Sequence, residues 1–375
     1  MIKPELNEIK KQFTPRTCSV SRIAGCYVDG DKNVKMTFGE AFHSIPEEET
    51  YKYFEILRKA LSGQLGKTAL SLDFPTEAEA EGGTQEFLLR LRDSKLKDEA
   101  LLNEFYERVI ETYDYVGNYL ILLVTDVYDI PGKTTDNILN EDASDLVYDY
   151  ILCTICPVTL SKPGLSYDSD ENIFRNRIRD WVVELPDAGF LFPAFNDRTA
   201  DIHGIMYYIK DSEEQHTELA DRIIGVPLNL SAKTQKETFR RLIEETLGDN
   251  TDYEAVSNIH ENLTEMETDH KNREIAEPLT LDKQEVRKLF ERSGVDEEHM
   301  ENFDRIYDEE AGEEASFFAG NIHNTRSYEV KTPDVVIKVN PERSDLVRTE
   351  IIDGRKCLVI EITDQVEVNG IGVRT

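Results

Sequence analysis

The chain has 375 residues and a formal net charge of −32, because 75 Asp and Glu residues outnumber 43 Lys and Arg residues. Hydrophobic residues make up 39% and charged residues 31%, which is the composition of a globular rather than a disordered chain. A negative charge of this size repels phosphates at long range, so it excludes general electrostatic binding to nucleic acid or to anionic lipid. Any nucleic-acid role therefore requires a local basic patch.

The N-terminal residues, the longest apolar run and the cysteines indicate the compartment of the protein. Residues 1–5 contain no apolar core of the kind found in signal peptides, and the longest apolar run, residues 119–124, is far shorter than the ~20 residues of a membrane span. The five cysteines, an odd number, do not form the pattern of a secreted disulfide framework. We therefore expect a cytoplasmic protein with reduced thiols and no membrane partner.

Residues 1–210 show the pattern of a mixed α/β domain. A helix is predicted after the capping-box sequence Ser44-Ile45-Pro46-Glu47, and a second one over residues 96–113. Runs rich in β-branched and aromatic residues predict the strands of an antiparallel or mixed sheet. These strands are residues 20–28 and 33–38, which form a hairpin, and residues 119–128, 146–158, 177–192 and 204–209.

The remaining residues are expected to form an acidic helical segment, 211–315, and a C-terminal antiparallel β-meander, 316–375. Residues 244–315 hold 24 acidic and 7 basic residues, a net charge of −17. The predicted helices are residues 213–224, 231–247, 253–268, 282–292 and 297–307. The predicted strands are residues 328–339, 346–352 and 356–362, with a two-residue turn at Asp353-Gly354. The predicted fold class is α+β.

Cys153 and Cys156 have the Cys-x-x-Cys spacing of redox and zinc sites. They lie in a strand pattern, however, and residues i and i+3 of a strand point to opposite faces. The two sulfur atoms are therefore not expected to converge. We predict two buried cysteines on opposite sides of one strand, without a metal.

A calcium-loop template matches Asp29, Asp31, Asn33 and Glu40, but Val34 replaces the glycine that its sharp turn requires. A plain hairpin turn is the favoured interpretation of these residues. Other familiar catalytic and cofactor motifs are incomplete. No cofactor, metal site or catalytic residue is predicted, although carboxylates from distant segments can still converge in the fold.

Two local basic groups stand out in this acidic chain. Arg175, Arg177 and Arg179 alternate before Trp181, so on a strand they form one cationic stripe with an aromatic side chain beside it. Arginines in a row bind phosphates bidentately, and an aromatic ring stacks on bases. The alternative is that these arginines neutralise neighbouring carboxylates. The second group lies on one face of the helix predicted over residues 231–247: it consists of Lys233, Lys236 and Arg240.

Two N-terminal stretches carry a family resemblance. They are Lys11-Gln12-Phe13-Thr14-Pro15 with Gly25-Cys26-Tyr27-Val28-Asp29-Gly30, and Tyr53-Phe54-Glu55-Ile56 running on to Leu61-Ser62-Gly63. Together with the overall length, they resemble a family of clostridial-type bacterial proteins known as domain of unknown function 4317. The resemblance covers nearly the whole chain and implies a bacterial cytosolic source, but it brings no activity and no catalytic residues.

A second, partial likeness concerns the C-terminal half. Leu219-Ala220-Asp221 followed by Leu230-Ser231-Ala232-Lys233-Thr234-Gln235-Lys236 is similar to a segment of YejK-type nucleoid-associated proteins. Val335-Val336-Ile337-Lys338-Val339 and the strands after it resemble the end of that family. This likeness implies association with the nucleoid.

The leading hypothesis is a non-enzymatic intracellular binding protein, nucleoid-associated-like in its C-terminal half. Its candidate partners are single-stranded nucleic acid, at a local basic stripe, or another protein. Two alternatives stay open. One is a hydrolase whose carboxylates converge only in the fold, and the other is a protein-interaction scaffold that works through its acidic helices.

Overall fold

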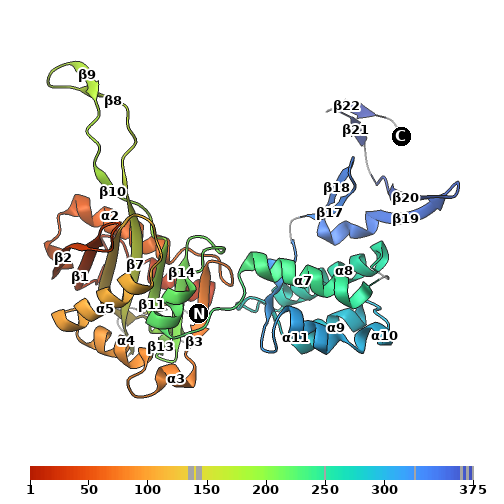
Figure 1. Cartoon of the computed structure of the whole chain (residues 1–375), viewed down its shortest axis with the longest axis horizontal. Coiled ribbons are helices and arrows are strands. Elements are labelled where there is room, and N and C mark those ends of the chain that lie inside the picture. The colour runs from red at the N-terminus through yellow and green to blue at the C-terminus, as the bar shows by residue number, and fades with distance from the viewer. Residues whose placement is uncertain are drawn as a thin grey trace. The chain divides into compact units, whose positions relative to one another are not determined.

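The computed structural model divides into two compact units, Met1–Leu228 and Asn229–Thr375 (Figure 1). Helices and antiparallel strands occur in both units, which confirms the α+β class. Among the described residues, no helix is both long enough and apolar enough to cross a membrane. The described residues are 1–133, 139–140, 146–248, 251–324, 327–363, 366–368 and 371–373.

An eight-stranded antiparallel sheet forms the centre of unit 1. Its strands are β1 (Arg22–Val28), β2 (Val34–Ala41), β3 (Ala69–Asp73), β4 (Asn118–Ile130), β7 (Leu146–Leu160), β10 (Trp181–Val183), β11 (Ala188–Phe192) and β14 (Gly204–Ile209). The strand order is β2-β1-β4-β7-β11-β14-β3, and β10 also pairs with β7. Among the described residues of unit 1, three short pairs lie outside this sheet: β5 (Gly132–Lys133) with β6 (Leu139–Asn140), β8 (Leu165–Asp168) with β9 (Ile173–Asn176), and β12 (Ala194–Asn196) with β13 (Thr199–Asp201).

Helices cover both faces of this sheet. One face packs against α1 (Lys3–Lys10), the 3-10 helix η1 (Phe42–Ser44) and α2 (Glu47–Ala60). The other face packs against α3 (Thr76–Glu79), α4 (Thr84–Asp93), α5 (Glu99–Thr112), α6 (Thr217–Leu219) and the π-helix η3 (Ala220–Ile224). Because both faces are covered, β4 and β7 are buried along most of their length, which explains their nearly continuous apolar sequences.

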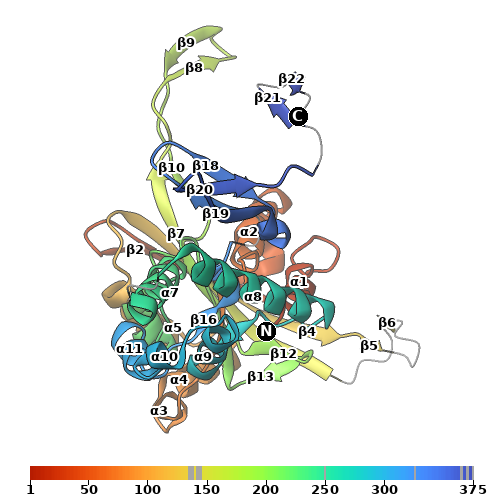
Figure 2. The same cartoon turned by 90° about the vertical axis from the view of Figure 1, so that its right-hand side faces the viewer.

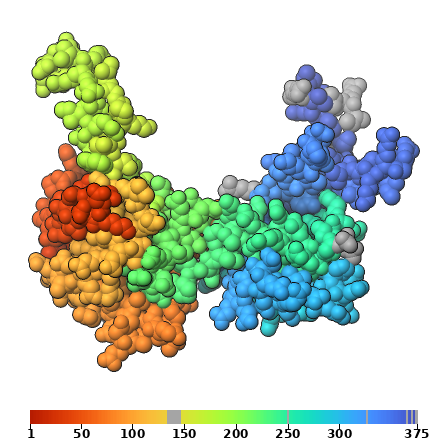
Figure 3. Space-filling model, viewed as in Figure 1, coloured from red at the N-terminus to blue at the C-terminus, as the bar shows by residue number. Residues whose placement is uncertain are grey.

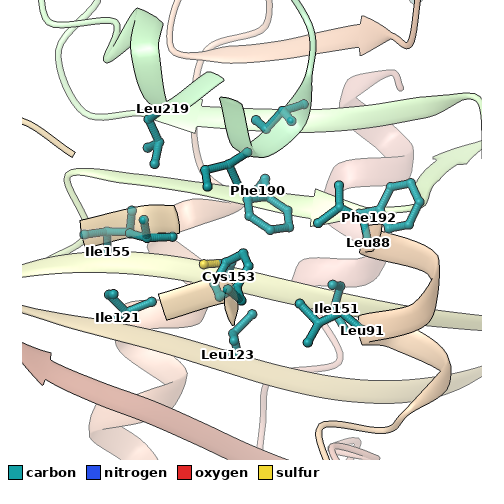
Figure 4. Packing of buried hydrophobic residues seen from close by; sticks show 14 of the residues in the cluster. Leu88, Leu91, Ile121, Leu123, Ile151, Cys153, Ile155, Phe190, Phe192 and Leu219 are labelled. Carbon is teal, nitrogen blue, oxygen red and sulfur yellow. The ribbon is translucent and has the colours of Figure 1, made fainter. Parts of the chain in front are cut away.

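Alternation along β7 separates the two cysteines as predicted. Ile151, Cys153 and Ile155 belong to the core under α4 and α5, whereas Leu152 and Cys156 belong to the core under α1 and α2. Figure 4 shows Cys153 packed among aliphatic and aromatic side chains of the first core. The two thiols therefore lie on opposite faces of one strand, as the period of two requires.

Two expectations for unit 1 were wrong in detail. The helix at 47–60 forms, but Pro46 and not Ser44 is its N-cap, and the Ser44 hydroxyl donates instead to the Ala41 carbonyl at 2.6 Å. The run 177–192 is not one strand, because residues 177–180 and 184–187 interrupt it around β10. The predicted hairpin of β1 and β2 is confirmed.

Unit 2 begins as a helical domain with its own core. Its helices are α7 (Ala232–Leu247), α8 (Tyr253–Asn272), α9 (Lys283–Arg292), α10 (Glu297–Met300), α11 (Phe303–Glu310) and α12 (Ala319–Ile322). A short pair, β15 (Thr280–Leu281) and β16 (Phe317–Phe318), joins them. Aromatic residues dominate the contacts: Phe239, Phe290, Phe303 and Phe317 pack edge to face with one another or with Tyr307. Most of the described acidic residues of this segment are exposed to solvent.

The C-terminal strands pair two by two rather than in one continuous meander. The pairs are β17 (Tyr328–Lys331) with β18 (Val336–Val339), β19 (Val347–Ile352) with β20 (Arg355–Ile360), and β21 (Val366–Val368) with β22 (Ile371–Val373); the 3-10 helix η5 (Pro341–Leu346) precedes β19. The predicted turn at Asp353-Gly354 is confirmed, since Ile352 pairs with Arg355. Both turn residues have positive φ, 52° and 74°, as a type I′ turn requires.

Candidate nucleic-acid interface

The three arginines predicted as a stripe lie on a narrow projection of unit 1, which we call the arm (residues 161–183). The arm continues from the end of β7, contains the antiparallel pair β8 (Leu165–Asp168) and β9 (Ile173–Asn176), and returns to the sheet through β10. Figures 1 and 2 show it extending away from the sheet, and Figure 3 shows it projecting from the surface of unit 1. Most of its residues are exposed to solvent.

The turn at the end of the arm explains how its first arginine is held. The carboxylate of Asp168 accepts hydrogen bonds from the backbone N–H groups of Asp170 and Glu171, at 2.9 and 3.1 Å. The same carboxylate forms an ion pair with Arg175, and Glu171 lies 3.9 Å from that guanidinium group. Arg175 is thus already neutralised by acidic neighbours.

The second and third arginines differ from the first. Arg179 donates from Nε to the Ser161 carbonyl at 2.7 Å and from Nη2 to the Leu160 carbonyl at 3.4 Å. Its guanidinium group thus has hydrogen-bond partners, but it forms no ion pair with a carboxylate of the described residues. Among the described residues, Arg177 makes no ion pair. Because residues 177–180 are not a strand, the alternation that would align all three arginines on one face is interrupted. Trp181 follows and is 54% exposed.

Charge is distributed unevenly along the arm. Its tip, residues 165–176, holds three acidic residues and Arg175, a net charge of −2. Its base, residues 161–164 and 177–183, holds Lys162, Arg177, Arg179 and Asp180, a net charge of +2. The cationic part of the arm is therefore its base, where Trp181 also lies.

The second basic group lies in unit 2, so the two predicted groups belong to different units. Lys233, Lys236 and Arg240 are exposed on α7, and the predicted start of this helix is confirmed because the Ser231 hydroxyl accepts from the Thr234 N–H. The Nε of Arg240 lies 3.4 Å from Glu244 one turn later. An i,i+4 pair of this kind is typical of a solvated helix face.

A family model described as "Domain of unknown function (DUF4317)" matches residues 1–371. The chain belongs to the DUF4317 family. The match spans both units, which agrees with a resemblance over nearly the whole sequence. No curated protein and no solved structure matches the chain.

Sequence reasoning missed a buried polar cluster in this DUF4317 chain. The Tyr113 hydroxyl donates to Asp187 Oδ2 at 2.7 Å, and His216 Nε2 lies 2.9 Å from the same oxygen. Burial by itself raises the pKa of Asp187, but the contacts with His216 and Tyr113 outweigh it, so the pKa lies below its ordinary value. No local motif could reveal the cluster, because its members come from segments far apart in the chain.

The calcium template corresponds to a hairpin turn. The Asp29 carboxylate accepts from the backbone N–H groups of Asp31 and Asn33 and lies 2.6 Å from the Lys35 ammonium. These bonds, led by that of Lys35, lower the pKa of Asp29 to about 2. Within the part of the chain that the structure describes, no group of three or more His, Cys, Asp or Glu residues is placed to hold a metal ion.

Proposed function

We propose that this chain is a non-enzymatic intracellular binding protein, nucleoid-associated-like, whose arm contacts single-stranded nucleic acid. The observation that carries the proposal is the base of the arm, where Arg177, Arg179 and the exposed ring of Trp181 occur together with a local charge of +2. Guanidinium groups bind phosphates, and an exposed ring offers a stacking surface to a base of any sequence. The YejK-like segments of the sequence support the same class of partner.

The charge of the whole chain sets the conditions for such binding. A net charge of −32 repels phosphates wherever it is not screened, and the Debye length is about 8 Å at physiological salt. Contact is therefore confined to the arm, and the affinity is weak. The ion pairs of Arg175 with Asp168 and Glu171 leave Arg177 and Arg179 as the main phosphate ligands.

The test is a titration of the full chain with a labelled single-stranded oligonucleotide at several salt concentrations. Arg177→Gln with Arg179→Gln should remove up to two phosphate contacts and flatten the slope of log affinity against log salt by roughly 1.4. Adding Arg175→Gln should change little further. Trp181 is the single tryptophan of the chain, so quenching of its fluorescence reports stacking on the arm directly.

The matched control is Arg305→Gln with Arg348→Gln, which makes the same change in net charge at two exposed arginines of unit 2 that pair with Glu309 and Glu350. This control should bind as the parent does. Equal losses in both variants, or no binding by the parent at low salt, would overturn the proposal. Metal bound in stoichiometric amount together with phosphoesterase turnover would favour the hydrolase instead.

The basic group on α7 is tested separately. Replacing Lys233, Lys236 and Arg240 together by glutamine removes three charges from unit 2 and leaves the arm unchanged. If the arm is the principal contact, this variant keeps the Trp181 quenching and most of the affinity. If this variant loses most of its affinity, but each complex that still forms shows the quenching of Trp181 fluorescence seen in the parent, the main contact lies instead on α7.

A further inference from the structure

The tip of the arm carries an apolar face that is open to solvent. In the ladder of β8 and β9, Tyr167 lies directly opposite Phe174, with ring centroids 5.4 Å apart. Leu165 is two residues from Tyr167 and therefore shares its face. The exposed fractions of Leu165, Tyr167 and Phe174 are 76%, 55% and 71%.

The described residues of unit 1 form no core with this face. Of the described residues that form the two cores of the unit, none comes from the arm. A two-stranded ribbon has no second layer of its own, and an isolated hairpin is marginally stable in water. Three adjacent apolar side chains at this level of exposure indicate a surface for a partner.

The distribution of charge along the arm indicates which partner it binds. The tip has a net charge of −2, from Asp168, Asp170 and Glu171 against Arg175, and the base has a net charge of +2. Two arms laid antiparallel place each tip beside the base of the other, so the surface is complementary to itself. Elsewhere, two chains of net charge −32 repel each other, whereas the arm as a whole is neutral.

We propose that the arm pairs with the arm of a second copy of this chain, antiparallel about a two-fold axis, through Leu165, Tyr167 and Phe174. In this arrangement the base of each arm covers the apolar tip face of the other arm, and each acidic tip lies against a basic base. The inference does not rest on nucleic-acid binding, although the partner's tip and a phosphate would both contact the base of the arm.

The first test is sedimentation velocity of the full chain over a range of concentrations without nucleic acid. The parent should form dimers, and Leu165→Ser with Phe174→Ser should weaken dimerisation by on the order of tenfold or more. Both positions are exposed, so the fold should be unaffected. The matched control is Ile351→Ser on β19, a residue that is also 76% exposed, and it should dimerise as the parent does.

The second test exchanges charges. Lys162→Glu with Arg177→Glu makes the base acidic, and in a second variant Asp170→Lys with Glu171→Lys makes the tip basic. Each variant should be monomeric alone, because its tip and base now carry the same sign, while a mixture of the two should form a heterodimer. A parent that stays monomeric at every concentration overturns the proposal, even if the arm then binds nucleic acid or anionic vesicles. Dimerisation that is indifferent to both sets of changes overturns it as well.

Discussion

The rings of His260 on α8 and His323 after α12 stack in unit 2, with centroids 5.8 Å apart and an interplanar angle of 29°. His323 is 7% exposed, and its Nε2 lies 3.0 Å from the Thr264 hydroxyl. Burial, with smaller contributions from His260 and Lys271, lowers the pKa of His323 to about 4. Burial and Lys236 also lower the pKa of His260. The pair is therefore held in the neutral form.

This pair should make unit 2 sensitive to acid. The folded pKa of His323, about 4, lies below its ordinary value of 6.5, so the unfolded chain binds a proton first as the pH falls. The stabilisation is complete above about pH 6.5 and is lost progressively toward pH 4, by roughly 3 kcal/mol for His323 alone. Hydrogen exchange of the α8 amides, followed across this range, measures the loss.

His323→Gln should flatten that pH dependence, because glutamine does not titrate. His203→Gln is the control, since His203 is an exposed residue of unit 1 that pairs with Glu79. If the hydrogen exchange of the α8 amides depends on pH in the same way in the parent and in His323→Gln, the stacked pair does not cause the sensitivity to acid.

The contact between Tyr113 and Asp187 predicts an asymmetric mutational effect in unit 1. Asp187→Ala leaves the buried Tyr113 hydroxyl without its acceptor and should lower the free energy of unfolding by about 2–4 kcal/mol. Tyr113→Phe removes only the donor and should lower the free energy of unfolding by about 1 kcal/mol. In the double variant the two losses should not add, and chemical denaturation of all three variants measures the coupling. Additive losses would show that the hydrogen bond is energetically unimportant.

Acid should also destabilise the cluster around Asp187, but through protonation of a carboxylate rather than of a histidine. The contacts with His216 and Tyr113 keep the pKa of Asp187 below its ordinary value of 3.8. Its stabilisation is therefore present at neutral pH and is lost only as the pH falls below that value. Unit 2 should thus respond to acid at a higher pH than this cluster does.

The sequence predicts those parts of the fold that depend on local periodicity. The long apolar runs of β4 and β7 identify strands buried on both faces, and the period of two alone separates Cys153 from Cys156. Asp353-Gly354 specifies a turn because it supplies two positive φ angles. In each case the residues that decide the structure are neighbours in the chain.

The parts that could not be predicted depend on distant partners. Tyr113 and Asp187 are 74 positions apart, and one sequence gives no signal that pairs them. The sequence shows the three arginines of the arm, but they share one face only if the strand continues through residues 177–180. There the chain leaves the strand, and Arg179 binds backbone carbonyls instead. Strand propensity does not specify where a ribbon departs from a sheet.

Gly189 on β11 should be intolerant of substitution because of the close approach of β7. A Cβ atom at this position would lie 2.4 Å from the Cys153 carbonyl oxygen and 3.3 Å from the Cα of Thr154, which are backbone atoms that cannot move without opening the sheet. Gly189→Ala should therefore destabilise unit 1 by about 1–3 kcal/mol or more. Gly164→Ala, in the arm, meets nothing within 4 Å and serves as the control. Equal unfolding midpoints for the two variants would contradict the close packing of β7 and β11.

The last prediction uses the cysteines as probes of the two cores. Burial raises the pKa of Cys153 well above its ordinary value and raises that of Cys156 to about 12. The thiolate is the reactive form, so both residues should resist maleimide in the folded protein. Cys357, half-buried on β20, should react with maleimide first, and Cys357→Ser should remove this fast phase of labelling.

Mass spectrometry of digests then follows the labelling of Cys153 and Cys156. Both thiols lie on one strand, in opposite cores, so they should be labelled together and only at the rate at which the sheet unfolds. Labelling of Cys156 well before Cys153 would show that the layer of α1 and α2 opens independently of the layer of α4 and α5.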